Sequence, residues 1–241
     1  MARPLFPAKS DGGESWISVS DLMAGLMMVF LFIAVIYAKD ANQRAQNVTE
    51  IVNEWQDTEL AIYEALEREF RADLAKWNAE IEKETLTIRF LSPEILFESG
   101  KADLTPTFQE VLNDFMPRYV QLLYSEFQTE IDEIRIEGHT SSRWSSAVSI
   151  NEAFIKNMSL SQERTRSVLD YSLNLPRLFP LTPWMTKTIS ANGLSSARLI
   201  ETDGREDERR SRRVEFTVKT KAKEALFRIL EKVAPAISKK L

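Results

Sequence analysis

An uninterrupted run of apolar side chains dominates the hydrophobic pattern near the N-terminus. Residues 22–38, LMAGLMMVFLFIAVIYA, contain no charged side chain, and one carboxylate, Asp21, stands at their start. Because a helix needs roughly 20 mostly apolar residues to cross a bilayer, the pattern predicts a transmembrane helix over residues 16–38 after a tail of residues 1–15. An acid at the entrance of such a helix is a candidate functional residue.

A cleaved signal peptide is the alternative interpretation of this segment. Signal peptides have an apolar core of about 7 to 15 residues and end in an A-x-A-like cleavage site. Here the run is longer and ends at Ile36–Ala38 without that pattern, which favours a retained helix. The basic residues before it, Arg3 and Lys9, and after it, Lys39 and Arg44, do not decide its orientation.

The absence of glycine and proline predicts that the helix continues beyond the membrane. Neither residue occurs between Gly25 and Pro93, so we expect residues 39–84 to form a helical stalk or linker. Aromatic side chains recur there every seven residues, with aliphatic ones near complementary positions: Tyr63, Phe70 and Trp77, then Leu66, Leu74 and Ile81. This seam fits either a helix packed on its own domain or a parallel helix pair.

The pattern changes from about Thr85 onward. Runs rich in β-branched and aromatic residues predict strands, and the segments between them predict helices, one with Pro106 in its first turn. We expect strands at residues 86–90, 134–138, 187–193 and 212–220, helices at 105–127, 160–173 and 221–233, and a proline-rich loop at 174–183. Strands that alternate with helices indicate one compact α/β (α+β) sandwich over residues 85–241.

Composition excludes several classes of function. The formal net charge of −5 offers no electrostatic reason to expect direct nucleic-acid binding. The chain has no cysteine, which excludes disulfides, thiolate metal sites and cysteine nucleophiles. The single histidine, His139, lies in no ligand pattern, so we expect a structural histidine and no metal site. No catalytic motif is present, and we expect neither enzyme activity nor a cofactor.

Four separated blocks of the sequence occur in a recognisable order: LTIRFLSPEILFESGKADLTP, IRIEGHT, NMSLSQERTRSVLDY and RRSRRVEF. Together they resemble the OmpA-like peptidoglycan-binding domain that the MotB family of stator subunits shares. The opening segment WISVSDLMAGLMM also resembles the membrane helix of MotB-type subunits. The resemblance implies an OmpA-like sandwich preceded by a single transmembrane helix and a helical stalk.

The resemblance implies an ion carrier in the membrane. In the family the membrane aspartate carries a proton or a sodium ion, and Asp21 is the matching residue. Burial raises the pKa of a carboxylate toward ambient pH, which suits loading and release of an ion. The implied partners are a ring of MotA-like or ZorA-like membrane subunits, a second copy of the chain in a homodimer, and peptidoglycan. The implied location is the bacterial inner membrane, with a single pass, a cytoplasmic N-terminus and a periplasmic C-terminal domain.

The resemblance also implies a peptidoglycan-binding site. Asn157, Leu160 and Arg164 match the family's N-x-x-L-S-x-x-R block, in which the arginine pairs with a carboxylate of the peptide stem. The family pattern has an aspartate directly after G-H-T, whereas this chain has Ser141, so one charge pair is missing. The loop after Ser141 is longer than in the family pattern, and Arg213 is expected to border the groove.

The features at both ends of the chain favour an ion-conducting stator subunit. Within that class the sequence most resembles the MotB-like subunits of Zorya anti-phage systems. Flagellar MotB proteins have a strongly basic tail, whereas residues 1–15 here have two basic and two acidic side chains. A flagellar-type stator subunit and a passive wall-anchoring membrane protein are the alternatives. Asp21 argues against the passive anchor, because a tether needs no acid at the entrance of the bilayer.

Overall fold

The computed structural model describes residues 12–91, 93–98 and 100–221, which form two compact units. One unit holds the described residues up to Val52, and the other begins at Asn53. Apart from Lys221, the helix expected at residues 221–233 lies outside the described residues, as do the first eleven residues of the expected tail.

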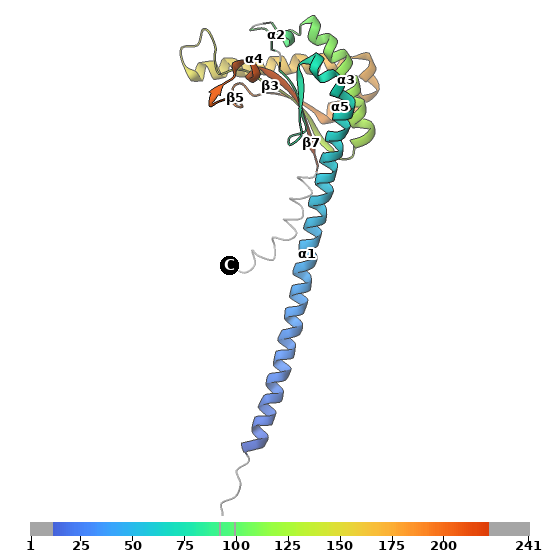
Figure 1. Cartoon of the computed structure of the whole chain (residues 1–241), viewed down its shortest axis with the longest axis vertical. Coiled ribbons are helices and arrows are strands. Elements are labelled where there is room, and N and C mark those ends of the chain that lie inside the picture. The colour runs from blue at the N-terminus through green and yellow to red at the C-terminus, as the bar shows by residue number, and fades with distance from the viewer. Residues whose placement is uncertain (1–11, 92, 99, 222–241) are drawn as a thin grey trace, which may run out of the picture. The chain divides into compact units, whose positions relative to one another are not determined.

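A single helix, α1 (Gly12–Trp77), begins the described chain (Figure 1). Within Val19–Trp77 it contains an apolar window of mean hydropathy 2.4, long and apolar enough to cross a membrane. The large apolar side chains in this window are exposed, as expected for residues whose solvent is lipid. The helix has no glycine or proline after Gly25, which explains its length.

The last turns of α1 belong to the core of the second unit. Leu66, Phe70 and Trp77 are at most 5% exposed, and the Phe70 ring lies 5.2 Å from that of Phe115. The other members of the aromatic and aliphatic seam, Tyr63, Leu74 and Ile81, pack partly buried against the same core. The seam therefore packs on its own domain. These residues lie before Thr85, within the predicted stalk.

A mixed five-stranded sheet organises the second unit, in the order β1-β2-β7-β3-β4. Only β3 and β4 run parallel, and the other neighbours are antiparallel. The strands are β1 (Ala79–Glu82), β2 (Thr87–Phe90), β3 (Ile131–His139), β4 (Ile189–Gly193) and β7 (Arg213–Thr220). Each of the four expected strands is confirmed, and β1 is an additional edge strand. The predicted α/β sandwich is confirmed.

Two long helices, α3 (Pro106–Phe127) and α4 (Ile150–Leu173), pack with this sheet (Figure 1). The remaining elements are short: α2 (Pro93–Leu96), η1 (Pro176–Leu181), α5 (Thr182–Thr188), β5 (Glu201–Thr202), β6 (Arg205–Glu206) and α6 (Glu208–Ser211). The segment 174–183, predicted as a loop, instead forms η1 and the start of α5. Proline fits the first turn of a helix, where its missing N–H is not needed.

Helix α4 begins ten residues earlier than predicted, because a capping box starts it. Ser149 Oγ accepts a hydrogen bond of 3.2 Å from the Glu152 amide. In return, Glu152 Oε2 accepts one of 2.9 Å from the Val148 amide. Ser149 and Glu152 thus form an S-x-x-E pattern, a local signal that the prediction missed.

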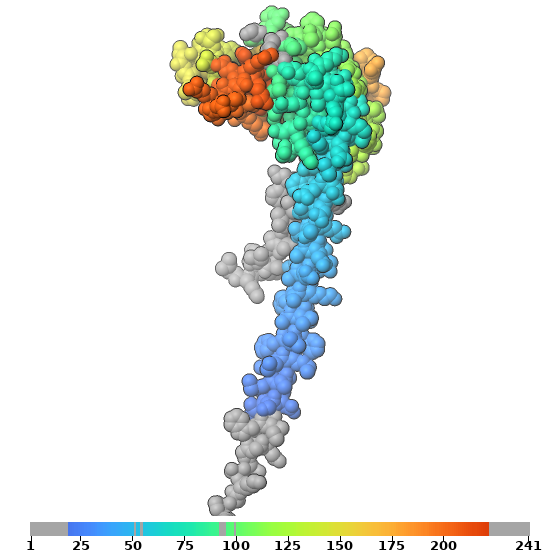
Figure 2. Space-filling view, viewed as in Figure 1, coloured from blue at the N-terminus to red at the C-terminus, as the bar shows by residue number. Residues whose placement is uncertain are grey.

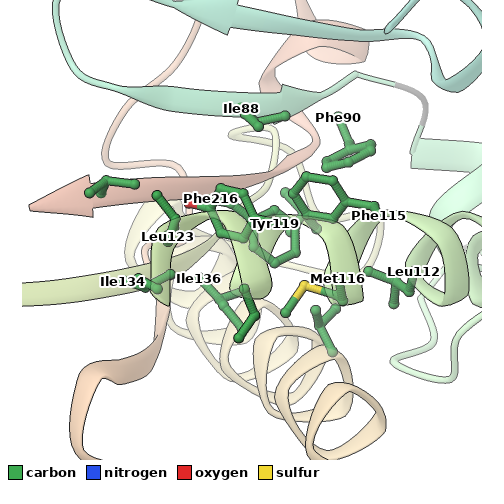
Figure 3. Packing of buried hydrophobic residues seen from close by; sticks show 14 of the residues in the cluster. Ile88, Phe90, Leu112, Phe115, Met116, Tyr119, Leu123, Ile134, Ile136 and Phe216 are labelled. Carbon is green, nitrogen blue, oxygen red and sulfur yellow. The ribbon is translucent and has the colours of Figure 1, made fainter. Parts of the chain in front are cut away.

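The hydrophobic core lies between the sheet and α3. Figure 3 shows Phe115 and Tyr119 of α3 beside Phe90 and Phe216 of the sheet. The Phe115 ring lies 5.2 Å from that of Phe90 and 5.0 Å from that of Phe216. Aromatic rings at these separations contribute stability beyond the burial of apolar area. This core holds the ends of β3 and β7 in place, and the candidate site lies beyond the end of β3.

Candidate functional site

A pocket of about 820 Å³ opens where the chain leaves β3. Its walls come from the loop 140–149, from the first half of α4, and from residues near α2 and α6. The described residues that line it are Phe97, Gly100, Thr140, Ser141, Ser142, Arg143, Trp144, Ser145, Ala147, Val148, Ser149, Ile150, Ala153, Asn157, Leu160, Arg164, Glu208 and Arg212.

Two glycines let α4 approach the sheet closely enough to form one wall of this pocket. A Cβ atom on Gly193 of β4 would lie 2.3 Å from the backbone nitrogen of Gln162. A Cβ atom on Gly138 of β3 would lie 2.8 Å from the carbonyl oxygen of Ser161. Real side chains do not tolerate such distances, so glycine is required at both positions. The close contact sets the position of Arg164, one turn further along α4.

Arg164 is a buried cation with no carboxylate partner among the described residues. Its Nε donates a hydrogen bond of 2.9 Å to the Lys101 carbonyl oxygen, and its Nη2 donates one of 3.3 Å to that of Glu98. The guanidinium carbon lies 4.7 Å from the Phe97 ring centroid. Burial, with a smaller contribution from Arg212, lowers the pKa of Arg164 to about 10. The side chain is therefore charged at neutral pH and able to receive an anion.

Thr140, which lines the same pocket, has a buried hydroxyl without a hydrogen-bond partner among the described residues. The residue is 3% exposed, and its Oγ1 has no hydrogen-bond partner in the described part of the chain. Its backbone is fixed, because the Thr140 amide donates to the Ser195 carbonyl oxygen at 2.9 Å. A buried hydroxyl without a partner costs free energy unless a ligand or water completes it. Sequence reasoning missed Thr140 and Arg212 as site residues, although both lie within matched motif blocks.

Asn157 holds the pocket loop rather than presenting its amide freely. Its Nδ2 donates to the carbonyl oxygens of Ser141, at 3.0 Å, and Arg143, at 3.3 Å. Leu160 lies one turn further along α4 and adds an apolar side chain to the lining. Four predicted site residues, Ser141, Asn157, Leu160 and Arg164, therefore meet in one pocket. Their part in peptidoglycan binding stays a prediction.

The outer wall of the pocket is tied to the segment around α6. Ser142 donates its backbone amide to Glu206 Oε1 at 2.9 Å, and Arg143 Nε pairs with Glu208 Oε1 at 3.0 Å. Figure 2 shows these two segments, in yellow and orange, side by side on the surface. Contacts with α4 and with the segment around α6 therefore hold the loop in place as one wall of the pocket.

Arg213 lies elsewhere, in a buried cluster of charged side chains behind the strand ends. It is not among the described residues that line the pocket, and its Nε pairs with Glu215 Oε1 at 2.6 Å. Arg89 pairs with the same carboxylate, while Arg135 and Arg198 pair with Glu137. Its neighbour Arg212, which lies between α6 and β7, lines the pocket instead. The binding role predicted for Arg213 stays a prediction.

His139 lies inside this charged cluster. Its Nε2 lies 3.3 Å from Glu215 Oε2 and 3.8 Å from Glu137 Oε2. These three residues offer donor atoms within 4.8 Å of one another, as in a metal site. However, two guanidinium groups already pair with each carboxylate, and their positive charge opposes a bound cation. The arrangement fits a structural charge network.

Asp21 lies on α1, is exposed, and directly precedes the uncharged run of residues 22–38. It belongs to the compact unit that holds the described residues up to Val52. A carboxylate at the start of a helix long and apolar enough to cross a membrane is a candidate functional residue. Its predicted ion-carrying role stays a prediction.

The sheet, the helices and the pocket beyond β3 define an OmpA-like domain, and the model of the OmpA family matches residues 96–213. The chain is also 42% identical over 226 residues to the Zorya protein ZorB of Escherichia coli strain Crooks. The aligned region covers 93% of this chain and 96% of that relative. The chain therefore belongs to the ZorB family.

A solved structure shows the same fold. A MotB-like protein from Desulfovibrio vulgaris is 24% identical and superimposes with a TM-score of 0.50. The match covers 70% of this chain and 98% of the other. The expected resemblance to MotB-like proteins with an OmpA-like domain is thus confirmed at the level of the fold.

Proposed function

We propose that this chain is the MotB-like subunit of an ion-driven rotary motor in the bacterial inner membrane, and that it anchors the motor to peptidoglycan in Zorya-type anti-phage defence. The role is non-enzymatic. Its partners are a ring of MotA-like or ZorA-like subunits and a second copy of the chain. The N-terminus lies in the cytoplasm and the OmpA-like domain in the periplasm.

One observation supports wall binding above the others: among the described residues, the buried guanidinium of Arg164 has no carboxylate partner, and the same pocket contains the Thr140 hydroxyl, which has no hydrogen-bond partner. A planar guanidinium and a hydroxyl together donate the hydrogen bonds that a carboxylate accepts. Peptidoglycan stem peptides present such carboxylates. Membership of the ZorB family and the OmpA-like fold support the same ligand.

Asp21 is the proposed ion carrier. It is the one carboxylate at the entrance of an otherwise uncharged span of α1. Enclosed by a partner ring, its carboxylate would bind a proton or a sodium ion on one side of the membrane and release it on the other. The work done on the ring requires a fixed reference, which the wall-bound domain supplies.

Sedimentation with purified peptidoglycan tests the anchor. We expect residues 53–241 to bind, because this unit has its own hydrophobic core. Arg164→Ala should weaken binding about 10-fold or more, the usual effect of losing a charged hydrogen bond. Arg166→Ala, an exposed position on the same helix, is the matched control. Equal sedimentation of the two variants would reject the Arg164 contact.

Ion flux in cells that also express the partner subunits tests the motor. Asp21→Asn should leave assembly intact and abolish both flux and phage protection. Asp40→Asn, an exposed acid on α1 beyond the apolar run, is the control that should retain both. Full protection by Asp21→Asn would favour the alternative, a passive wall anchor. Proton and sodium gradients applied in turn would identify the ion.

A further inference from the structure

The pocket is chemically divided. Arg164 and Arg212 make part of it cationic, and Arg212 lies close enough to lower the pKa of Arg164. The wall formed by the loop 141–149 has no net charge, because its one ionic side chain, Arg143, pairs with Glu208. That wall consists mainly of serine hydroxyls, aliphatic groups and the indole of Trp144. A ligand carboxylate would pair with the cationic part of the pocket but would make no contact with the neutral wall.

The neutral wall is ordered by its own hydrogen bonds. Trp144 Nε1 donates to Ser146 Oγ at 3.0 Å, and the Ala147 amide donates to the Trp144 carbonyl oxygen at 3.1 Å. Asn157 and Glu206 hold the beginning of the loop, and the α4 capping box holds its end. The indole is thus fixed before a ligand arrives, which reduces the entropy cost of binding.

The groups on this wall match the chemistry of an N-acetylated sugar. A pyranose ring presents aliphatic C–H groups on its faces, which the negative face of an aromatic ring attracts. Its hydroxyls exchange hydrogen bonds with serine, which both donates and accepts. Val148 and Ile150 at the mouth are 93% and 88% exposed, and an acetyl methyl group would cover such side chains.

We propose that the loop 141–149 forms a sugar subsite, in which Trp144 stacks on an N-acetylated hexose of the glycan strand while Arg164 and Thr140 bind a carboxylate of the attached peptide. This inference rests on the proposed wall-binding function and adds a ligand group to it. The loop 141–149 is longer than in the family pattern, and in this proposal its extra residues bind the sugar in addition to the peptide.

Calorimetric titration of the full-length protein in detergent tests the proposal with two soluble probes. One is the disaccharide–tetrapeptide released from peptidoglycan, and the other is the same tetrapeptide without sugar. The wild type should bind the disaccharide form about 3- to 10-fold more tightly, the range expected for one aromatic stacking contact. Trp144→Ala should remove this difference and leave the affinity for the free peptide unchanged. Trp144→Phe, which keeps an aromatic face, should restore most of it.

Arg164→Ala separates this proposal from the proposed function, because it should weaken both probes equally and leave their ratio intact. Equal wild-type affinity for the two probes would overturn the sugar subsite while leaving the wall anchor standing. An equal loss of both probes in Trp144→Ala would also overturn it, since the indole would then only shape the pocket. If the wild type bound neither probe, the wall-binding function itself would fail, and the sugar subsite with it.

Discussion

Asn157 Nδ2 donates a hydrogen bond of 3.0 Å to the carbonyl oxygen of Ser141, so helix α4 directly holds the first residue of the pocket loop. The family pattern has a carboxylate at the position of Ser141. Here Ser141 instead contributes its backbone carbonyl oxygen, and α4, which holds that oxygen, also carries Arg164 in the pocket lining. The side chain of Asn157 therefore keeps the loop and the guanidinium in one arrangement.

Asn157→Ala is expected to lower the free energy of unfolding by about 1–2 kcal/mol, because the carbonyl oxygens of Ser141, in a buried contact, and of Arg143, in a partly buried one, lose their donor. It should also weaken peptidoglycan binding, since the loop is no longer held. Denaturant titration and sedimentation measure the two effects. Asn151→Ala, at an exposed position of α4, should change neither. Normal binding by Asn157→Ala would show that the loop needs no such support.

Thr140→Val separates a ligand contact from a structural one. Valine has nearly the same shape, and the hydroxyl it removes has no partner among the described residues, so stability should stay the same or rise. Binding to peptidoglycan should fall several-fold. Thr165→Val is the contrast, because Thr165 Oγ1 donates to the Ser161 carbonyl oxygen at 3.2 Å and Thr165 is not among the residues that line this pocket. A stability loss in Thr140→Val without a binding loss would contradict the assignment.

Gly193→Ala is expected to destabilise the second unit by about 3 kcal/mol or more. The added methyl group would meet backbone atoms of Gln162, which have no flexible end to move aside. Gly204→Ala is the matched control, since it meets nothing within 4 Å and only its φ of +72° opposes a side chain, at about 1 kcal/mol. Thermal unfolding of both variants measures the difference. Similar losses would mean that α4 adjusts its position.

Arg118→Met tests how firmly α1 is joined to the domain. Arg118 Nε donates to Glu69 Oε1 at 2.7 Å, its Nη1 donates to Asp73 at 2.9 Å, and its guanidinium lies 5.0 Å from the Phe70 ring. We expect the free energy of unfolding to fall by about 1–2 kcal/mol, because the group is partly exposed. Arg68→Met removes an exposed pair with Glu126 and should cost less than about 0.5 kcal/mol. Equal losses would reject the special role of Arg118.

The buried His139 predicts a loss of stability in mild acid. Burial lowers the pKa of His139 below its ordinary value of 6.5, against the raising effect of Glu215. The unfolded chain therefore takes up a proton at a higher pH than the folded one. The free energy of unfolding should fall as the pH drops below about 6.5, and this fall should stop once the folded His139 also protonates.

Denaturant titrations of the wild type and His139→Gln across this pH range check the prediction. The variant should lose the part of the slope just below pH 6.5. A second decline should begin below pH 4.5 in both proteins, because Glu215, although burial opposes its ionisation, has a lowered pKa through His139 and Arg213. The Arg213 contribution remains in the variant. An unchanged slope near pH 6 in His139→Gln would place the acid sensitivity elsewhere.

Local patterns in the sequence determined the elements of this protein. The absence of glycine and proline after Gly25 predicted the long α1, and alternating β-branched and aromatic residues predicted the sheet. A matched motif block identified Asn157, Leu160 and Arg164 as candidate site residues, and the predicted helix at 160–173 included the last two of them. These features depend on neighbours within a few residues, so the sequence expresses them directly.

Only the tertiary structure decided what each side chain meets. Among the described residues, it buried Arg164 without a carboxylate partner and left the Thr140 hydroxyl of the same pocket without a hydrogen-bond partner. It also directed Arg213 into a charged cluster and not into the pocket lining. It also packed the aromatic seam of α1 on its own domain, the first of the two arrangements that the sequence left open. Each outcome depends on contacts between segments far apart in the chain, and the local pattern is the same whichever partner the fold supplies.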